Sequence, residues 1–342
     1  MGLLIYACQR TVGAMPKPLG LIRAELAHDG RTDYRFVGLQ LLLPAVILTS
    51  GTSLGPEATL VSCTLLFGQW LTEKLAYLTA GSATNTRAWW RAALAPHRGL
   101  APTARLRWAP RTVAFLAVGL TAFYWTCRWG GEPSVRVMLG ASRWGHRELA
   151  LLLPLIVLGW CLGHLEKAAM MALRQVLLGR VRQTGALIVV GGVAIYAATL
   201  WLPAINFSGM ANFQLLATSW PARSVGFLAL AAGLKLALLT ICLNTGWLGG
   251  DIFPVLFATT AQGLALSHLM PGVDALFVVA VLAISAGATI LGEPLVAGGV
   301  MAALFLPGNL ALISVATTAL MSLLERRSGP PVAWVRRRRL VE

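Results

Sequence analysis

The chain has 342 residues, of which 57% are hydrophobic and only 12% are charged, about half the charged share that is usual in soluble proteins. The mean hydropathy is +0.71, and several apolar runs approach the roughly 20 residues that a bilayer span requires. The net charge of +15 lies mostly between those runs, with no aromatic-interleaved soluble domain, which argues against nucleic-acid binding. The composition predicts one all-α, polytopic membrane domain.

The first apolar segments are separated by a short break. Residues 2–9 are too short to span a membrane, as if the chain began partway into a helix, and a break with two prolines follows at 11–18. An amphipathic segment at 19–27 comes next, before two longer apolar runs at 36–48 and 60–71. We expect both of these longer runs to form membrane helices.

The stretch between the two longer runs, residues 49–59, has the composition of a turn. Gly51 and Gly55 allow the chain to bend sharply, and Pro56, which has no N–H, suits the first turn of a new helix. Non-helical backbone at membrane depth survives only where it lines a cavity or is buried in protein. A helix that begins there directs N–H groups and its positive dipole end into that cavity, which predicts an anion site.

The next region changes in character. Residues 75–131 contain no acidic residue, and 87–111 are rich in arginine, proline and tryptophan. These features predict a long basic cytoplasmic loop or insert at about 81–111; the alternative is a frameshift or deletion that has replaced native sequence. An apolar run at 112–127 and a polar, basic loop at 134–147 complete the region.

The remaining chain is a series of apolar helices of unequal length, which indicates tilted and broken helices rather than a regular bundle. We expect helices at 149–178, 185–205, 225–243, 252–269, 276–291, 295–306 and 310–324. Four consecutive arginines at 336–339 predict a cytoplasmic tail. The predicted domains are an N-terminal half of the membrane domain at 1–182, a C-terminal half at 183–327 and a basic tail at 328–342.

The break after the first long run has a counterpart in the second half. Leu54-Gly55-Pro56-Glu57 is matched by Leu248-Gly249-Gly250-Asp251, which also lies between two apolar runs. Corresponding interrupted segments in two halves indicate a transport site between inverted repeats. The alternative is a chance similarity, because glycine-rich breaks are common in membrane helices.

These residues also resemble the signatures of the ClC chloride channels and transporters. Gly55-Pro56 looks like the end of the family's second signature, and residues 249–254 look like its Gly-Gly-x-Phe-x-Pro signature. Gly13 lies where the serine of the first signature is expected, and Trp334 lies near the expected aromatic ligand. The resemblance, to a divergent or truncated bacterial-type member, implies chloride or other small-anion transport. It also implies a homodimer in the cell (inner) membrane, with no enzyme activity, cofactor or metal.

The resemblance implies which residues bind the anion, mainly through helix N-termini. The candidate anion-binding residues are Ser53, Leu54, Gly55, Glu57, Gly249, Gly250, Asp251, Ile252 and Phe253. In the family a gating glutamate stands directly before Gly-Pro, where this chain has Leu54. Glu57 follows the proline instead, and is either a helix-stabilising residue or a gate and proton carrier. Passive permeation and anion exchange therefore both remain open.

Two further interpretations come from other classes of protein. A degenerate membrane protein of the same fold that no longer transports would explain the altered signatures. An intramembrane serine hydrolase would use Ser53, which lies in a G-x-S-x-G pattern, with His164 or His268, although that pattern normally follows a strand. Lys235 lies inside an apolar run, where we expect it to reach the interface or pair with an acid, or else to attract anions. The five cysteines are scattered and indicate no disulfide framework or metal site.

Overall fold

The computed structural model describes residues 1–11, 22, 25, 37–55, 62–64, 66–71, 117, 121, 125, 139–181, 183–207 and 210–327. The chain divides into two compact units. The first contains Met1–Gly13, Ile47–Gly55 and Pro133–Glu342, and the second contains Ala14–Val46 and Pro56–Glu132. In the second unit, residues 62–64 and 66–71 are helical. Both breaks, at residues 50–55 and 245–251, lie within the first unit.

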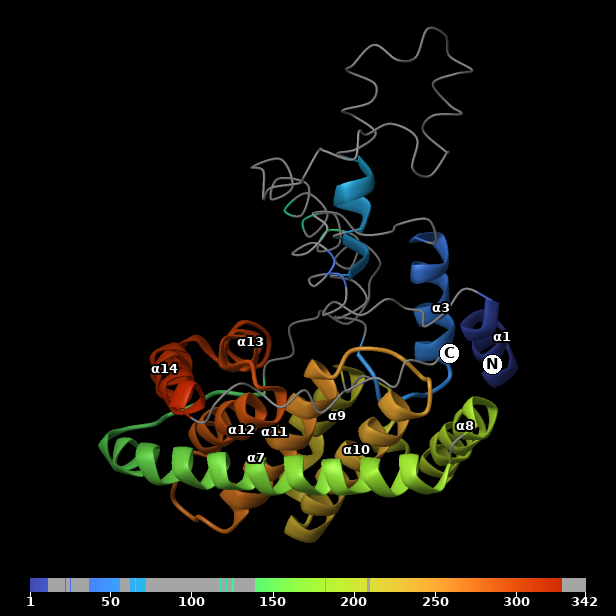
Figure 1. The fold of residues 1–342 in the computed structure, drawn as a ribbon. Helices are drawn as coiled ribbons and strands as arrows, with labels where there is room; N and C mark the ends of the chain where they lie inside the picture. Colours follow the sequence, from blue (N-terminus) through green and yellow to red (C-terminus); the bar gives the residue numbers. More distant parts are fainter. Residues whose placement is uncertain are drawn as a thin grey trace, which may run out of the picture. The chain divides into compact units, whose positions relative to one another are not determined.

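The described residues form helices, which confirms the all-α prediction, and Figure 1 shows their arrangement. The α-helices are α1 (Gly2–Thr11), α3 (Val37–Thr49), α7 (His146–Arg180), α8 (Thr184–Trp201), α9 (Met210–Ser219), α10 (Val225–Asn244), α11 (Ile252–His268), α12 (Ala275–Leu291), α13 (Pro294–Val300) and α14 (Ala311–Arg327). Short helical turns cover Pro203–Ile205, Trp220–Ala222, Met301–Phe305 and Gly308–Leu310. Every apolar run predicted after residue 148 contains a helix close to its expected bounds.

Four of the described helical segments are long and apolar enough to cross a bilayer. They are His146–Arg180, Thr184–Trp201, Val225–Asn244 and Gly308–Arg326. Since α7 has 35 residues, it is about 50 Å long, well beyond the roughly 30 Å of a hydrocarbon core. A helix of this length is either strongly tilted or extends past the core, as the unequal predicted lengths indicated.

Local sequence signals set several helix ends. Ser224 accepts a hydrogen bond from the Phe227 N–H at 3.2 Å at the start of α10. Asp274 accepts one from the Phe277 N–H at 2.8 Å at the start of α12. Both side chains satisfy an N–H that has no partner inside its own helix. Helix α12 stops at Gly292, whose φ of +69° favours glycine.

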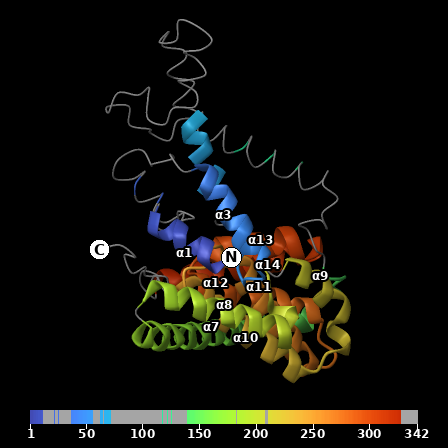
Figure 2. The same ribbon diagram turned by 90° about the vertical axis from the view of Figure 1, so that its right-hand side faces the viewer.

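The core lies around α12, whose residues from Leu276 to Ile290 are all buried. Figure 1 shows α7 crossing α10 and α12, and Figure 2, turned by 90°, shows α7 running beside α10. Gly159 and Gly163 lie one turn apart on α7 and face α12. A Cβ at Gly163 would lie 2.8 Å from Thr289 Cβ and 2.9 Å from the Ala286 carbonyl oxygen. Two small residues four positions apart bring membrane helices this close.

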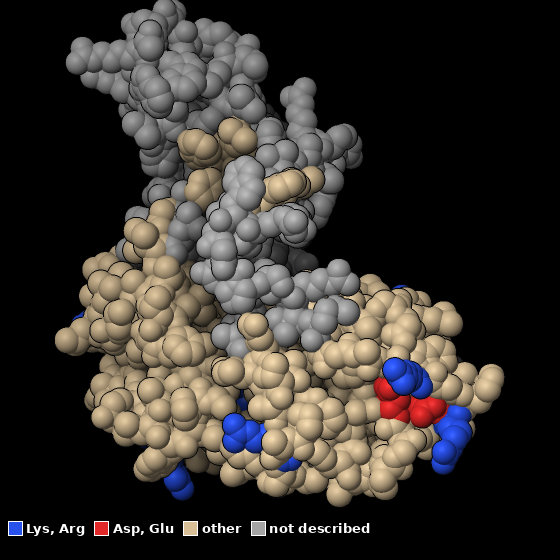
Figure 3. Space-filling model, turned by 180° about the vertical axis from the view of Figure 1, so that it is seen from behind, with Lys and Arg blue, Asp and Glu red and all other residues tan. Residues whose placement is uncertain are grey.

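The outer face of the described helices is apolar. Figure 3 shows a mostly tan surface on which the described charged side chains occur in small, separate groups. Large exposed hydrophobic residues are frequent on α7, α8 and α14 and include Leu153, Val157, Leu165, Val189, Val193, Tyr196, Leu312 and Val315. A water-soluble monomer rarely exposes so much contiguous apolar surface, whereas lipid contact requires it.

Candidate anion site

The two breaks meet in the structure. The Gly55 N–H donates to the Gly250 carbonyl at 2.8 Å, and the Gly250 N–H donates to the Gly55 carbonyl at 2.7 Å. The two glycines thus form an isolated antiparallel bridge. The two interrupted segments therefore lie together, as their repeated pattern indicated, but the amides of Gly55 and Gly250 bond to each other instead of pointing into a shared polar space.

The bridge leaves little room between the segments. A Cβ added at Gly249 would lie 2.8 Å from the Leu54 Cβ and 3.4 Å from the Gly55 carbonyl oxygen. Leu54 is fully buried. The amides of Gly55 and Gly250 already have acceptors, so an anion here depends on neighbouring amides and on the dipole of α11, which begins at Ile252.

The first break is a compact polar turn at the end of α3. Gly51 has a φ of +80°, which only glycine adopts at little cost. The Thr52 hydroxyl donates to the Ile47 carbonyl at 3.1 Å, and the Ser53 hydroxyl donates to the Lys235 carbonyl at 3.5 Å. Both side chains are fully buried. Since the Ser53 bond is at the long limit of a hydrogen bond, this hydroxyl can also turn toward an anion.

Lys235 is a buried cation beside the first break. Its side chain has 0% exposure, and its ammonium group donates to the carbonyls of Ile205 at 2.7 Å, Phe207 at 2.6 Å and Asn206 at 3.4 Å. The Phe257 ring lies 5.4 Å from the Nζ atom. The prediction that Lys235 reaches the interface or pairs with an acid is wrong, because main-chain carbonyls from a distant loop solvate it.

The loop at residues 205–207 directs its main-chain carbonyls toward the Lys235 ammonium group. Phe207 has a φ of +60°, uncommon for a residue that carries a side chain, and its N–H donates to the Gly51 carbonyl at 3.4 Å. Asn206 donates to Thr199 Oγ1 at 2.7 Å, and its carbonyl accepts from Asn212 Nδ2 at 2.8 Å. Asn206 was missed as a partner of Lys235 because the two are 29 positions apart with no shared local pattern.

The second break is held by hydrogen bonds to α1 and α8. Gln9 of α1 donates to the Gly246 carbonyl at 2.7 Å, and Trp247 donates to the Ile188 carbonyl of α8 at 3.1 Å. Gly246 has a φ of +90°. Asp251 is the N-cap residue of α11, but its side chain makes no capping hydrogen bond. Its main-chain carbonyl accepts a hydrogen bond from the Val255 N–H at 3.0 Å, so Asp251 supports the start of α11 through its backbone.

An aromatic cluster lies against the first two turns of α11. Phe213 and Phe305 stack with their ring centroids 4.0 Å apart. Phe257 lies 5.4 Å from Phe213, and Phe253 lies 6.1 Å from Phe305, both edge to face. An apolar wall of this kind lowers the local dielectric and strengthens the interaction of an anion with nearby amides. Phe213 and Phe305 were not predicted, since only the fold brings them to α11.

Several predicted residues lie outside the described part of the chain. These are Gly13, Pro56, Glu57, the basic block at 81–111 and Trp334. The hydrolase interpretation receives no support from the described contacts. His164 contacts the Trp160 carbonyl at 3.0 Å and His268 the Trp220 carbonyl at 3.3 Å, and the Ser53 hydroxyl is bonded to Lys235. Among the described residues no group of three or more His, Cys, Asp or Glu side chains is placed to hold a metal.

Broken helices paired at glycine within an apolar, all-α assembly define a polytopic membrane transport fold. The sequence model described as "Voltage gated chloride channel" matches residues 1–324, and the chain belongs to this family. It therefore transports anions across a membrane, as a channel or an exchanger, and its family consists of transporters and channels rather than enzymes.

Comparison with solved structures agrees with this fold. The chain is similar to a protein whose structure is described as "Crystal structure of a CLC-type fluoride/proton antiporter", with a TM-score of 0.55 and 15% sequence identity. The match covers 95% of this chain and 90% of the other one. No curated protein matches the chain.

Proposed function

We propose that the protein lets chloride cross the bilayer along a path between the first break and the start of α11. Ser53, Leu54 and Gly55 line one side of this path, and residues 249–253 line the other. The observation that carries the proposal is the pair of hydrogen bonds between Gly55 and Gly250. It joins two breaks at a helix N-terminus, which is a suitable place for an anion.

The charge and polarity around the two breaks favour an anion over other small solutes. The Lys235 ammonium group lies at the 205–207 loop, which contacts the first break through the hydrogen bond from the Phe207 N–H to the Gly51 carbonyl. Its bonds to three carbonyls account for the three hydrogens of the ammonium group, so it acts through its charge and does not bind the anion directly. The breaks otherwise offer glycines, small hydroxyl side chains such as Thr52 and Ser53, one acid at Asp251 and short apolar walls, which suit a small ion.

Within this function, we favour uncoupled permeation. A leucine at position 54 cannot carry a proton or compete with chloride for a site, and Leu54 is fully buried against Gly249. Proton-coupled exchange is the competing mechanism. It is supported by the similarity in fold to a protein described as a fluoride/proton antiporter, and it requires Glu57 to act as the proton carrier.

The test is chloride efflux from liposomes that contain the purified full-length chain. We expect efflux above that of protein-free liposomes, a faster rate in Leu54→Ala because the path widens, and unchanged pH dependence in Glu57→Gln. Efflux no faster than from protein-free liposomes would identify a non-transporting member of the fold. Proton movement against a chloride gradient that Glu57→Gln abolishes would replace the uncoupled mechanism with exchange.

The assembly and location belong to the same proposal. We place the protein as a homodimer in the inner membrane with residues 328–342 on the cytoplasmic side. The family and the run of arginines at 336–339 support this arrangement. The division into two inverted halves at residue 182 is supported by the pairing of the two breaks. Chemical cross-linking in native membranes and protease access to a C-terminal tag test these points.

A further inference from the structure

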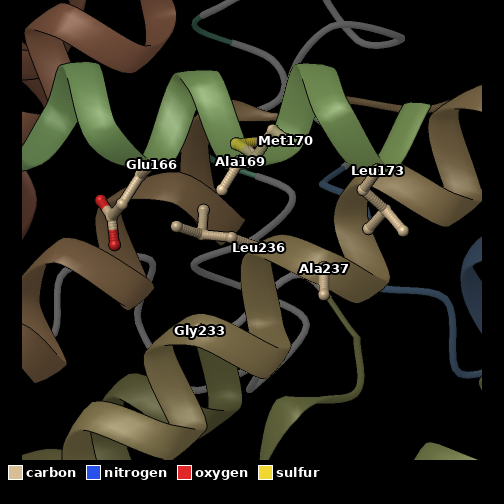
Figure 4. Close-up of a pocket in the computed structure, with 7 residues that line it drawn as sticks. All are labelled: Glu166, Ala169, Met170, Leu173, Gly233, Leu236 and Ala237. Carbon is tan, nitrogen blue, oxygen red and sulfur yellow. The ribbon is translucent and has the colours of Figure 1, made fainter. Parts of the chain in front are cut away.

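A buried acid lies at the edge of a pocket between α7 and α10. Glu166, Ala169, Met170 and Leu173 line the pocket from α7, and Gly233, Leu236 and Ala237 line it from α10, with an empty volume of about 390 Å³. In Figure 4, Glu166 and Leu173 lie at opposite ends of the residues from α7. The carboxyl group of Glu166 contacts the side chain of Gln262 on α11, which does not line the pocket. This carboxyl group therefore belongs to the contact between α7 and α11.

The contact with Gln262 leaves two oxygen atoms without a donor. Gln262 donates its amide nitrogen to Glu166 Oε1. Glu166 Oε2 and Gln262 Oε1 are both buried and have no hydrogen-bond partner among the described residues. Buried acceptors without a donor are costly, and neither oxygen is accessible to water or to a ligand in the pocket. The missing donor therefore has to belong to the pair itself.

The cations on the helices around Glu166 are bonded elsewhere. On α7, Lys167 donates to a carbonyl of α12 at 3.0 Å, and Arg174 donates to a side chain of α10 at 3.0 Å. On α10, Lys235 is bonded to the carbonyls at 205–207. A negative charge on Glu166 would therefore be buried without a hydrogen bond from any of these cations.

The other titratable groups on these helices do not donate to Glu166 either. His164 contacts a carbonyl of its own helix, α7, at 3.0 Å, and His268, at the end of α11, contacts a carbonyl at 3.3 Å. Cys242 of α10 is fully buried, α12 has no titratable residue, and α14 has its titratable residues at 325–327, in its last turn. An acid that is buried without a positive partner favours its neutral, protonated form.

We propose that Glu166 is a proton-binding site, in which the proton is held on Oε2 and donated to Gln262 Oε1. An acid and a primary amide can exchange two hydrogen bonds, because the amide N–H donates to the acid and the acid O–H donates to the amide oxygen. This pairing provides a donor for both oxygens that otherwise lack one, and it leaves the site without charge.

The bound proton connects two helices. With the proton in place, two hydrogen bonds join α7 to α11, the helix that begins beside the second break. Loss of the proton removes the bond from Oε2 and leaves a carboxylate, which can turn away from Gln262 into the pocket that Glu166 lines. The proposal does not depend on which anion the protein carries or on the role of Glu57.

Infrared spectroscopy reads the protonation state directly. The full-length protein is measured in a maltoside detergent, which has no carbonyl group that would mask the signal. At neutral pH we expect the carbonyl stretching band of a protonated carboxyl group, which weakens as the pH is raised and returns when the pH is lowered. Carbon-13 labelling of glutamate should shift this band. The absence of such a band in the wild type at neutral pH would overturn the proposal.

Variants locate the band. Glu166→Gln should fold and lose the band, because its amide N–H replaces the acid O–H in the pair with Gln262. Glu148→Gln is the matched control and should keep it, since Glu148 accepts from the N–H groups of Gly145 at 2.8 Å and Asp274 at 3.3 Å, as an ionised carboxylate does. Gln262→Leu keeps the acid but removes its partner, so the band should shift to higher frequency. A band that persists in Glu166→Gln, or that is unshifted in Gln262→Leu, contradicts the assignment.

Thermal unfolding provides an independent readout. Above about pH 5 the unfolded chain releases the Glu166 proton while the folded chain keeps it, so the wild type should lose stability relative to Glu166→Gln as the pH rises. We expect the difference between the two unfolding temperatures to change by about 2–4 °C per pH unit until the folded chain also releases the proton. A difference that is constant with pH would show that folding does not involve a proton on Glu166.

Discussion

The two breaks have similar sequences but are held in place by different contacts. The first, at 50–55, is held by bonds to the helix that leads into it and to α10, through Thr52 and Ser53. The second, at 245–251, is held by Gln9 of α1 and by the contact of Trp247 with α8. Both turn at a glycine with positive φ, Gly51 and Gly246.

The two breaks are therefore stabilised by different kinds of interaction. Near the first break the essential feature is electrostatic, because the Lys235 cation is solvated by the carbonyls at 205–207. At the second break it is steric, because Gly191 of α8 leaves the space that Trp247 and Thr245 occupy. A matching pattern of Leu, Gly and acid thus specifies where the chain breaks without specifying what holds it in place. Four comparisons of variants test this contrast.

The largest effect is expected from Lys235→Met. The substitution leaves the carbonyls of Ile205 and Phe207 buried without their donor, which costs about 2–5 kcal/mol of folding free energy and lowers the unfolding temperature by on the order of 10 °C. Thermal unfolding of the purified protein measures it. Arg223→Met is the matched control, since Arg223 is exposed and lies over the Phe227 ring at 4.8 Å. Equal unfolding temperatures for both variants would show that the carbonyl contacts of Lys235 are not essential.

The second break should be sensitive to bulk at Gly191. A Cβ there would lie 2.6 Å from the Trp247 ring, so Gly191→Ala should destabilise the protein by about 1–3 kcal/mol through overpacking. The neighbouring Gly192→Ala places its Cβ 3.6 Å from the same ring, an ordinary contact, and should be neutral or slightly stabilising. Thermal unfolding and chloride efflux of the pair provide the comparison. Similar losses in both variants would contradict the steric explanation.

The contact between the breaks is tested by Gly249→Ala. Its Cβ would meet the Leu54 Cβ at 2.8 Å, so we expect a loss of about 1–2 kcal/mol together with slower chloride efflux. Leu54→Gly removes the opposing atom, and the double variant should recover part of the loss, with a coupling of about 1 kcal/mol. Strictly additive effects would mean that the two positions do not touch.

The smallest effects are expected from single hydrogen bonds. Gln9→Leu removes the bond to the Gly246 carbonyl, and Thr52→Val removes the bond to the Ile47 carbonyl; each should cost about 0.5–1.5 kcal/mol. Amide hydrogen exchange followed by mass spectrometry distinguishes them. Exchange should rise at 244–251 in the first variant and at 48–55 in the second. A rise at both breaks in both variants would show that the two supports are coupled.

The sequence by itself determined the class of protein, the helices and the positions of the breaks. Apolar runs of near-membrane length predict helices because each must satisfy its backbone hydrogen bonds internally, and glycine and proline mark where that pattern stops. Helices α8, α10, α11 and α12 accordingly lie close to their expected bounds. The proximity of the two breaks was also predictable, because a repeated break indicates a shared site, but the hydrogen bonds between Gly55 and Gly250 were not.

Only the tertiary structure decided what surrounds the breaks. The solvation of Lys235 by the 205–207 loop, the approach of Gln9 to Gly246, and the stacking of Phe213 on Phe305 join residues far apart in the chain. No local period or motif encodes such contacts, since they depend on which faces of the helices come together. The Glu166–Gln262 pair is decided in the same way: a carboxylate within an apolar helix shows that a partner is needed, but packing against α11 selects which one.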